Sequence, residues 1–251
     1  MKKRIISRLE IKNNFVVKGI RMEGLRKIDH PWNLIKNYYI DGIDEIIISD
    51  VVASLYGRNS LLDLIRKTAL EVDIPICVGG GIRSIKDIRD LLYSGADKVS
   101  INSYAVQNNN FVLEASKVFG SQCIIIEIHA KKKTENKWEV YIENGREPTG
   151  LDVFDWIKKV QKLGAGEILL VSVDNDGSKS GFDFELANLA SKICEIPIIF
   201  GGGACQPSNA LEIFELTSID ALFFGNILHF NTYTIKDIKD FLIKNTVEIR
   251  K

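Results

Sequence analysis

A glycine triplet that occurs twice restricts the fold of this chain more than any other feature. The first copy, Val-Gly-Gly-Gly-Ile, covers residues 78–82, and the second, Phe-Gly-Gly-Gly-Ala, covers residues 200–204. Each copy follows an Ile-Pro-Ile segment, at residues 74–76 and 196–198. Because glycine adopts positive φ at little cost and leaves the backbone N–H groups open, such a loop is suited to holding phosphate. Two copies in the same setting indicate an internal repeat.

The repeat extends into the flanking segments and predicts the architecture. Residues 42–47 correspond to residues 164–169 at the same offset as the two triplets. Nearly continuous apolar strands alternate with amphipathic helices in both halves, which is typical of a parallel sheet buried on both faces. We therefore predict one α/β domain over residues 1–251, a (βα)8 TIM barrel built from two (βα)4 halves at about 1–120 and 121–251. A doubly wound open sheet is the alternative, and the half-length repeat favours the closed barrel.

Local patterns predict several segments outside the barrel strands. Residues 20–30 and residues 56–60 are expected to form loops, and alternating apolar residues within 131–148 predict a small inserted hairpin. Ser84 is expected to cap a helix over residues 85–94.

The charge balance limits the class of partner. Lys plus Arg and Asp plus Glu number 33 each, so the formal net charge is zero, which argues against a general binder of nucleic acid or membranes. Neither a signal peptide nor a membrane-spanning apolar run is evident, so a cytoplasmic protein is expected. The three histidines, His30, His129 and His229, are scattered, so we expect no metal site, and we expect no cofactor.

The carboxyl ends of the predicted strands form the mouth of the barrel, where the active site is expected. Two groups of residues there, related by the repeat, are candidates for binding phosphate, which suggests a substrate with a phosphate at each end. The alternative is that their glycines only make tight turns. The first group is Gly80, Gly81, Asn102 and Ser103, the second is Asp176, Gly177, Gly202, Gly203, Gly225 and Asn226, and Asp50 lies in the same mouth.

Glu10 and His129 end the predicted first and fifth strands at equivalent places, so they are expected to face each other across the mouth. A carboxylate and an imidazole can act as a general acid–base pair. A hydrogen-bonded polar pair without a catalytic role is an equal alternative. At the opposite end, Arg4, Glu45, Lys98 and Glu167 begin four strands, and position alone favours a structural ring of salt bridges there.

Several motifs together make the chain resemble the cyclase subunit of imidazole glycerol phosphate synthase, the HisF family, over nearly its whole length. The resemblance implies a two-phosphate barrel that works with a glutaminase subunit, whose ammonia enters at the barrel floor and reacts at the mouth. Lys18, within one motif, is counted with the residues that bind the phosphorylated substrate. The motifs are residues 3–6, 16–19, 78–82, 95–102, 119–122, 164–170 and 176–181.

The resemblance also assigns roles to single residues. It makes Arg4, Glu45, Lys98 and Glu167 the charged gate to the ammonia passage, and places Asp97 and Gln122 where the glutaminase docks. The family's catalysts are two aspartates, at the positions that hold Glu10 and His129 here, and Arg8 replaces a residue that is usually small.

A retained gate beside an altered catalytic pair leads to three hypotheses. The first is an ammonia-receiving subunit that works with a HisH-like glutaminase and a separate sugar amidotransferase in acetamidino-sugar formation for surface polysaccharide or flagellin glycan. The alternative is a cyclase of histidine biosynthesis in which Glu10 and His129 replace the aspartates. The second alternative is a non-catalytic scaffold that only conducts ammonia.

Overall fold

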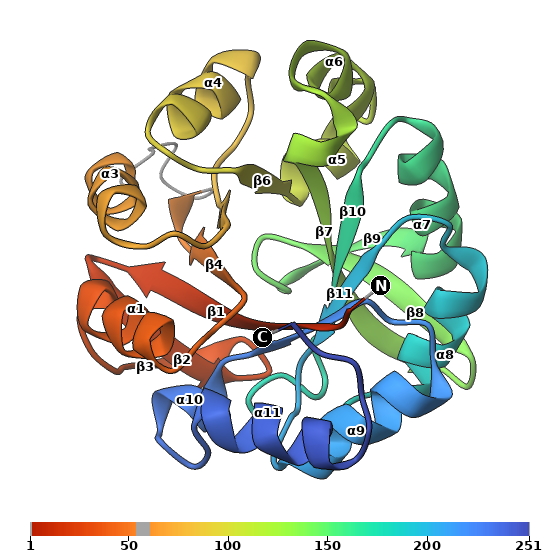
Figure 1. Cartoon of the computed structure of the whole chain (residues 1–251). Helices are drawn as coiled ribbons and strands as arrows, with labels where there is room; N and C mark the ends of the chain where they lie inside the picture. Colours follow the sequence, from red (N-terminus) through yellow and green to blue (C-terminus); the bar gives the residue numbers. More distant parts are fainter. Residues whose placement is uncertain (1, 54–60, 251) are drawn as a thin grey trace.

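A closed parallel barrel forms the centre of the computed structural model, which describes residues 2–53 and 61–250 (Figure 1). The strands pair in parallel in the order β10, β11, β12, β1, β4, β5, β6 and β7, and β7 pairs with β10 to close the ring. The predicted (βα)8 barrel is therefore confirmed, and the open-sheet alternative is wrong. The barrel strands are β1 Arg4–Lys12, β4 Glu45–Asp50, β5 Ile76–Gly79, β6 Lys98–Ile101, β7 Ile124–Thr134, β10 Glu167–Ser172, β11 Ile198–Gly201 and β12 Ala221–Phe224.

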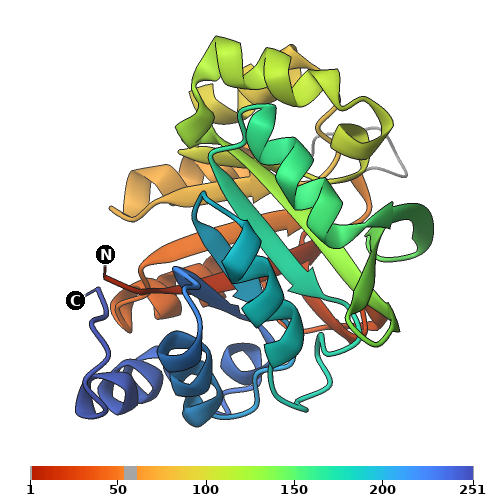
Figure 2. The same ribbon diagram turned by 90° about the vertical axis from the view of Figure 1, so that its right-hand side faces the viewer.

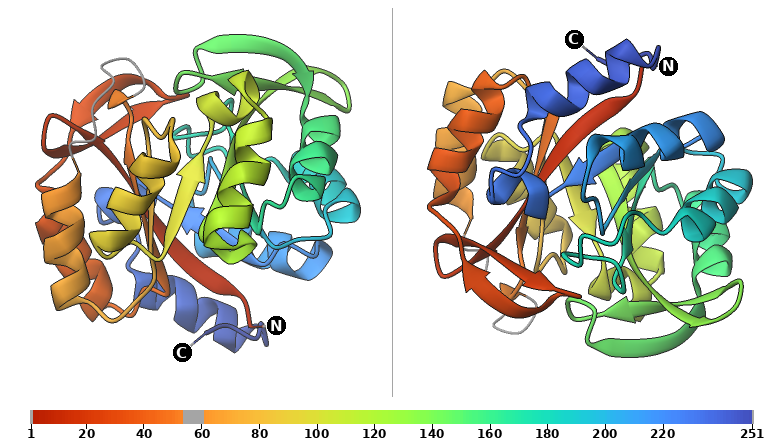
Figure 3. Two further views of the ribbon diagram at one scale, coloured as in Figure 1. Left: turned by 90° about the horizontal axis from the view of Figure 1, so that it is seen from above. Right: turned by 90° about the horizontal axis from the view of Figure 1, so that it is seen from below.

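Helices surround the barrel and pack their apolar faces on the strands (Figures 1 and 3). The predicted cap of α4 is confirmed, because the Asp87 N–H donates to the Ser84 hydroxyl and the Asp87 carboxylate accepts from the Ser84 N–H. The long helices are α1 Pro31–Ile40, α3 Leu62–Glu71, α4 Ile85–Tyr93, α6 Asn110–Phe119, α7 Val153–Lys162, α8 Phe184–Ile193, α9 Pro207–Leu216 and α11 Ile235–Lys244. The short elements are α5 Ser103–Gln107, α10 Asn226–His229 and the 3-10 turn η1 Ser121–Cys123.

Two antiparallel extensions rise from the barrel mouth. The predicted loop at residues 20–30 is wrong in part, because β2 Phe15–Ile20 and β3 Glu23–Lys27 form a hairpin on the extended end of β1. The predicted inserted hairpin is confirmed and has a third strand, since β7 continues into β8 Lys137–Ile142 and β9 Glu147–Asp152. The expected loop at residues 56–60 lies outside the described residues. Both halves therefore begin with a long strand followed by two antiparallel strands, an arrangement compatible with the half-barrel division.

The barrel axis is filled by apolar side chains. Ile6, Ile47, Cys77, Ile125 and Leu169 are all fully buried and belong to one cluster with Ile199 and Phe223. The chain ends meet at the floor, where Lys3 bridges to Ile249 (Figure 2). Within residues 2–53 and 61–250, no helix is both long and apolar enough to cross a membrane.

Candidate functional site

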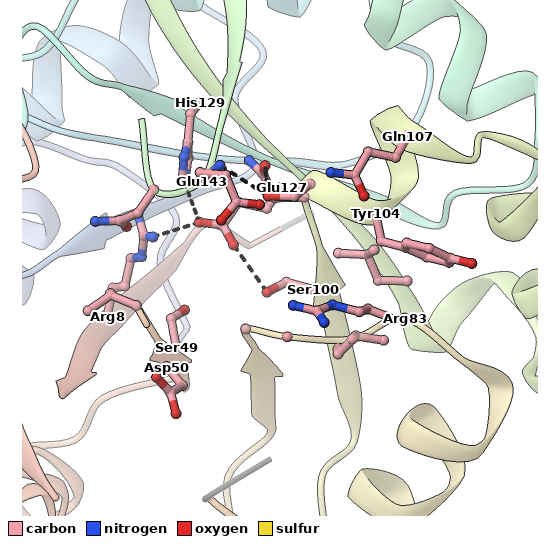
Figure 4. Close-up of a pocket in the computed structure, with 18 residues that line it drawn as sticks. Arg8, Ser49, Asp50, Arg83, Ser100, Tyr104, Gln107, Glu127, His129 and Glu143 are labelled. Carbon is pink, nitrogen blue, oxygen red and sulfur yellow. Dashed lines mark hydrogen bonds and ion pairs between the residues drawn. The ribbon is translucent and has the colours of Figure 1, made fainter. Parts of the chain in front are cut away.

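A cavity of about 300 Å³ opens at the mouth (Figure 4). It is bordered by the ends of β1, β4, β5, β6 and β7, so it belongs mainly to the first half of the chain. All four residues of the first predicted phosphate group line it, together with Asp50. The other polar lining residues are Arg8, Ser49, Arg83, Ser100, Tyr104, Gln107, Glu127, His129, Glu143 and Asn144.

Gly80 shows that the first glycine loop has a structural requirement of its own. Its φ is +101°, and a Cβ added there would lie 2.3 Å from the Asp50 carbonyl oxygen. Only glycine fits this close approach to the neighbouring strand end. The tight-turn interpretation therefore holds for Gly80, while phosphate binding by the same loop stays a prediction.

A second cavity of only about 20 Å³ lies on the side of the mouth formed by the second half of the chain. The second predicted phosphate group comes together around it, and Lys18 joins the group. This volume admits about one water molecule. The lining residues predicted from the sequence are Lys18, Asp176, Gly177, Gly202, Gly203, Gly225 and Asn226.

Lys18 joins two buried carboxylates beside this small cavity. Its Nζ lies 2.7 Å from Asp176 Oδ2 and 3.1 Å from Glu10 Oε1. Burial alone would lower the pKa of Lys18, but the attraction of Asp176 and Glu10 raises it overall. Burial likewise opposes ionisation of Glu10, yet Lys18 and Arg8 lower the pKa of this carboxyl below its ordinary value. Both groups are therefore charged at neutral pH, and Glu10 is an anion.

A second buried network, at the wall of the larger cavity, joins Arg8, Glu127 and His129 (Figure 4). Glu127 Oε1 lies 2.6 Å from Arg8 Nη2 and 2.8 Å from His129 Nε2. Each of the three residues is 6% exposed or less. Burial would raise the pKa of Glu127, but the Arg8 guanidinium and His129 outweigh it and hold this pKa at about 2. Arg8 also stacks on Phe223, with its guanidinium 5.4 Å from the ring centre.

The expected acid–base pair is thus divided between the two networks. Glu10 bonds to Lys18 and His129 bonds to Glu127, and no direct hydrogen bond between Glu10 and His129 occurs in the described part of the chain. The role of each as a catalyst stays a prediction. Sequence reasoning missed Glu127, although a signal was present: a lone carboxylate stands two residues before His129 in an otherwise apolar strand, so both side chains face the barrel interior.

His229, which sequence reasoning also missed as a site residue, hydrogen-bonds to the backbone of Arg8. Its Nε2 donates to the Arg8 carbonyl oxygen at 3.1 Å, and its Nδ1 accepts from the Tyr38 hydroxyl at 2.7 Å. Burial, with the nearby Lys18 cation, lowers the pKa of His229 to about 3, so the ring is neutral. The neutral ring fixes the backbone of β1 at the residue that carries the guanidinium.

The floor of the barrel carries a ring of four alternating charges, as predicted. Glu45 bonds to Arg4 at 2.8 Å and to Lys98 at 3.1 Å, while Glu167 bonds to Lys98 at 3.0 Å and also to Arg4. Each cation therefore contacts both anions. The ring is a structural fact, and its use as an ammonia gate stays a prediction.

The two predicted docking residues lie at this same end. Asp97 is exposed, and its carboxylate accepts from the Ile76 N–H at 2.8 Å at the start of β5. Gln122 is exposed in η1 at the start of β7. Within the described residues, no cluster of three or more His, Cys, Asp or Glu side chains is suited to a metal ion.

Comparisons with known proteins agree with this geometry. The sequence profile of the family described as histidine biosynthesis protein matches residues 4–234. The subunit HisF of imidazole glycerol phosphate synthase from Lactococcus lactis subsp. lactis (strain IL1403) is 46% identical over 249 residues, which cover 99% of this chain and 96% of that protein. The protein of the same name from Bacillus cereus (strain G9842) is 45% identical over 248 residues, 99% of this chain and 98% of the relative. The chain therefore belongs to the histidine biosynthesis protein family, and within it to the enzyme subunits of the HisF type.

Proposed function

We propose that this chain is the ammonia-using cyclase subunit of a glutamine-dependent synthase, and that it forms imidazole glycerol phosphate in histidine biosynthesis. The observation that carries the proposal is the arrangement along one barrel axis: a charged ring at the floor, an apolar centre and a polar cavity at the mouth. The names of the relatives favour this role over the sugar-amidination role that was predicted first from the sequence.

The barrel centre supports a passage for ammonia in its neutral form. The cluster that fills the barrel interior consists of Ile, Leu, Val, Phe, Ala, Met and Cys side chains, so it offers no oxygen or nitrogen atom to replace the hydration of an ammonium ion. Burying an unpaired cation among such groups is very costly, whereas neutral ammonia loses far less. An ammonium ion should therefore lose its proton at the floor, where the Glu45 and Glu167 carboxylates lie, before ammonia enters the apolar interior.

Exposed apolar side chains at the floor support docking of a glutaminase subunit. In a βα barrel the helices run opposite to the strands, so their carboxyl ends surround the floor. Six helices each expose a large apolar residue at the last or next-to-last position, between 47% and 86% exposed. Apolar groups gathered in this way mark a surface for a protein partner. They are Ile40, Leu70, Tyr93, Val118, Leu216 and Ile243.

The glycine loops of both halves support a substrate with two phosphate groups. The loops after β5 and β6 border the large cavity, and those after β10, β11 and β12 border the small one.

A second candidate function is favoured by the centre of the mouth. Arg8 and His129 stand where the family resemblance implies a small residue and an aspartate, and Glu127 joins these two side chains. Such a change suits a different carbonyl acceptor, as in acetamidino-sugar formation with a separate sugar amidotransferase.

The test is turnover of the linear phosphoribulosyl precursor by the purified chain with an ammonium salt and no partner. Formation of imidazole glycerol phosphate is the expected result. If the folded chain binds a HisH-type glutaminase and yet releases no product, histidine biosynthesis is excluded and the second candidate takes its place. The conduit hypothesis is separated by the double variant Glu10→Gln, His129→Asn, because a scaffold that only conducts ammonia would tolerate it.

A further inference from the structure

The two ring nitrogens of His129 have different surroundings. Nε2 lies 2.8 Å from Glu127 Oε1, whereas Nδ1 is buried and has no hydrogen-bond partner among the described residues. A carboxylate can only accept, so Nε2 carries the proton of the neutral ring. In the neutral ring the lone pair is therefore on Nδ1, in a side chain that borders the large cavity.

Glu127 is held in place from two further sides. Its Oε1 also accepts from Arg8 Nη2 at 2.6 Å, and its Oε2 accepts from the Ser100 hydroxyl at 3.4 Å. Glu127 sits on β7 two residues before His129, while Arg8 projects from β1 on another side of the barrel (Figure 4). One carboxylate thus sets the position of two side chains from different strands.

Arg8 uses Nη2 to bond to Glu127, and its other guanidinium nitrogens stay available as donors. Its Nε and Nη1 are buried and lack an acceptor within the described structure, although the residue lines the cavity. A buried donor without an acceptor costs free energy, and a ligand oxygen placed there would remove that cost. The cavity therefore offers a fixed cationic donor beside a fixed proton acceptor.

We propose that Glu127 is a positioning residue for ammonia addition, which orients His129 as a proton acceptor through Nδ1 and Arg8 as a donor to the acceptor's carbonyl oxygen. The ammonia lone pair forms the C–N bond while the carbonyl π pair moves onto oxygen, which Arg8 binds. The new ammonium nitrogen releases a proton to Nδ1, and the same proton then passes to the alkoxide, giving a neutral carbinolamine. The carbonyl acceptor rests on the proposed function, but the orientation of His129 does not.

The first test reads the tautomer of His129 by nitrogen-15 NMR of histidine-labelled protein without substrate, with the signals assigned from a His129→Asn variant. The neutral ring is expected to carry its proton on Nε2, and Glu127→Met, which removes the acceptor oxygen, is expected to abolish that preference. A wild-type ring protonated on Nδ1 would overturn the proposal. Because Glu127→Met leaves Arg8 without its anion, the double variant Arg8→Met, Glu127→Met repeats the reading with both charges removed.

The second test measures ammonium-dependent turnover of the phosphoribulosyl precursor. Glu127→Met, which removes the acceptor of His129 Nε2, is expected to lower kcat by about 10²- to 10⁴-fold with KM nearly unchanged. The matched control is Glu139→Met. The Glu139 carboxylate bonds to Lys133 and the Gly150 N–H on the inserted hairpin, away from the cavity. If the His129 tautomer changes in the Glu127 variant while kcat stays at the wild-type value, the proposed role of His129 orientation in catalysis is overturned. Absence of turnover in the wild type would count against the proposed function, and the tautomer would still decide the role of Glu127.

Discussion

The two ends of the barrel both hold buried charges, but they use them differently. At the floor, two cations and two anions form a closed ring in which each cation contacts both anions. At the mouth, Arg8, Glu10 and His129 each retain a buried polar atom without a partner among the described residues. In the closed ring every charged group has a partner of opposite charge. An incomplete network keeps donors and acceptors available, which is what an active site requires.

Removing one arginine from each end should show this difference most strongly. Arg8 is 2% exposed and supplies the cation to Glu127, so Arg8→Ala leaves a buried carboxylate without its charge partner and should cost about 3–5 kcal/mol of unfolding free energy. Arg4→Ala should cost less, about 1–2 kcal/mol, because Lys98 still bonds to both Glu45 and Glu167. Urea unfolding of both variants gives the comparison, and an equal or larger loss at Arg4 would contradict it.

The buried carboxylates at the two ends of the barrel should also change the unfolding free energy in opposite directions as the pH falls. The pKa of Glu127 is about 2 in the folded protein and ordinary in the unfolded chain, so its stabilisation is present above about pH 4.5 and is lost as the pH falls toward 2. The loss is on the order of 3 kcal/mol. At the floor, burial raises the pKa of Glu45 more than Lys98 lowers it, so protonation of Glu45 favours the folded state as the pH falls.

Unfolding free energies measured between pH 7 and pH 3 check these signs. The double variant Arg8→Met, Glu127→Gln should lose less stability in acid than the wild type, because it lacks the low-pKa carboxyl. Glu45→Gln should lose more, because it lacks the group that takes up a proton on folding. The reverse order would refute the assignment of the two carboxylates.

Glycines at the two ends should respond unequally to an added methyl group. Gly80→Ala, at the mouth, places Cβ 2.3 Å from the Asp50 carbonyl and should cost about 2–4 kcal/mol, because backbone must move. Gly42, before β4 at the floor, also has positive φ, but open space surrounds its Cβ position. Gly42→Ala should cost about 1 kcal/mol, from the left-handed backbone alone. Thermal or urea unfolding measures both, and equal losses would show that the close approach at Gly80 relaxes freely.

The smallest effect on stability is expected at the apolar rim of the floor. Leu70 is 86% exposed at the end of α3, so Leu70→Ser should change the unfolding free energy by less than about 0.5 kcal/mol. If this rim is the docking surface, the same variant should weaken binding of a HisH-type glutaminase by about 1 kcal/mol or more. Calorimetric titration measures the binding, with Leu151→Ser on the inserted hairpin as the matched exposed control.

The barrel was predictable from the sequence because its signals are local and repeated. Buried parallel strands require continuous apolar segments, and the duplicated glycine loops fix their order. The floor ring was predictable because Glu45, Lys98 and Glu167 each begin a strand and Arg4 begins another, so all four reach the same end. The hairpin of β2 and β3 was missed because residues 23–27 carry only one large apolar side chain, Leu25, and their strand depends on pairing with β2 and the extended end of β1.

The mouth network was not predictable in the same way. The ends of β1 and β7 suggested that Glu10 faces His129, but the partner of each side chain depends on how the two strands are staggered around the barrel. In the structure, Lys18 from the hairpin pairs with Glu10, and Arg8 reaches Glu127 across the interior. Pairing across a barrel depends on strand tilt and stagger, which are properties of the closed sheet and not of any one strand.

The most direct measurement compares one variant from each end in the same ammonium-driven reaction. The wild type, the mouth variant Glu10→Gln, His129→Asn and the floor variant Lys98→Gln receive the phosphoribulosyl precursor and an ammonium salt, without a glutaminase. Ammonia from solution reaches the open cavity directly, so the floor variant should keep most of the wild-type rate and the mouth variant should lose it. Loss of turnover in the floor variant, or wild-type turnover in the mouth variant, would contradict the division of the barrel into a conducting floor and a reacting mouth.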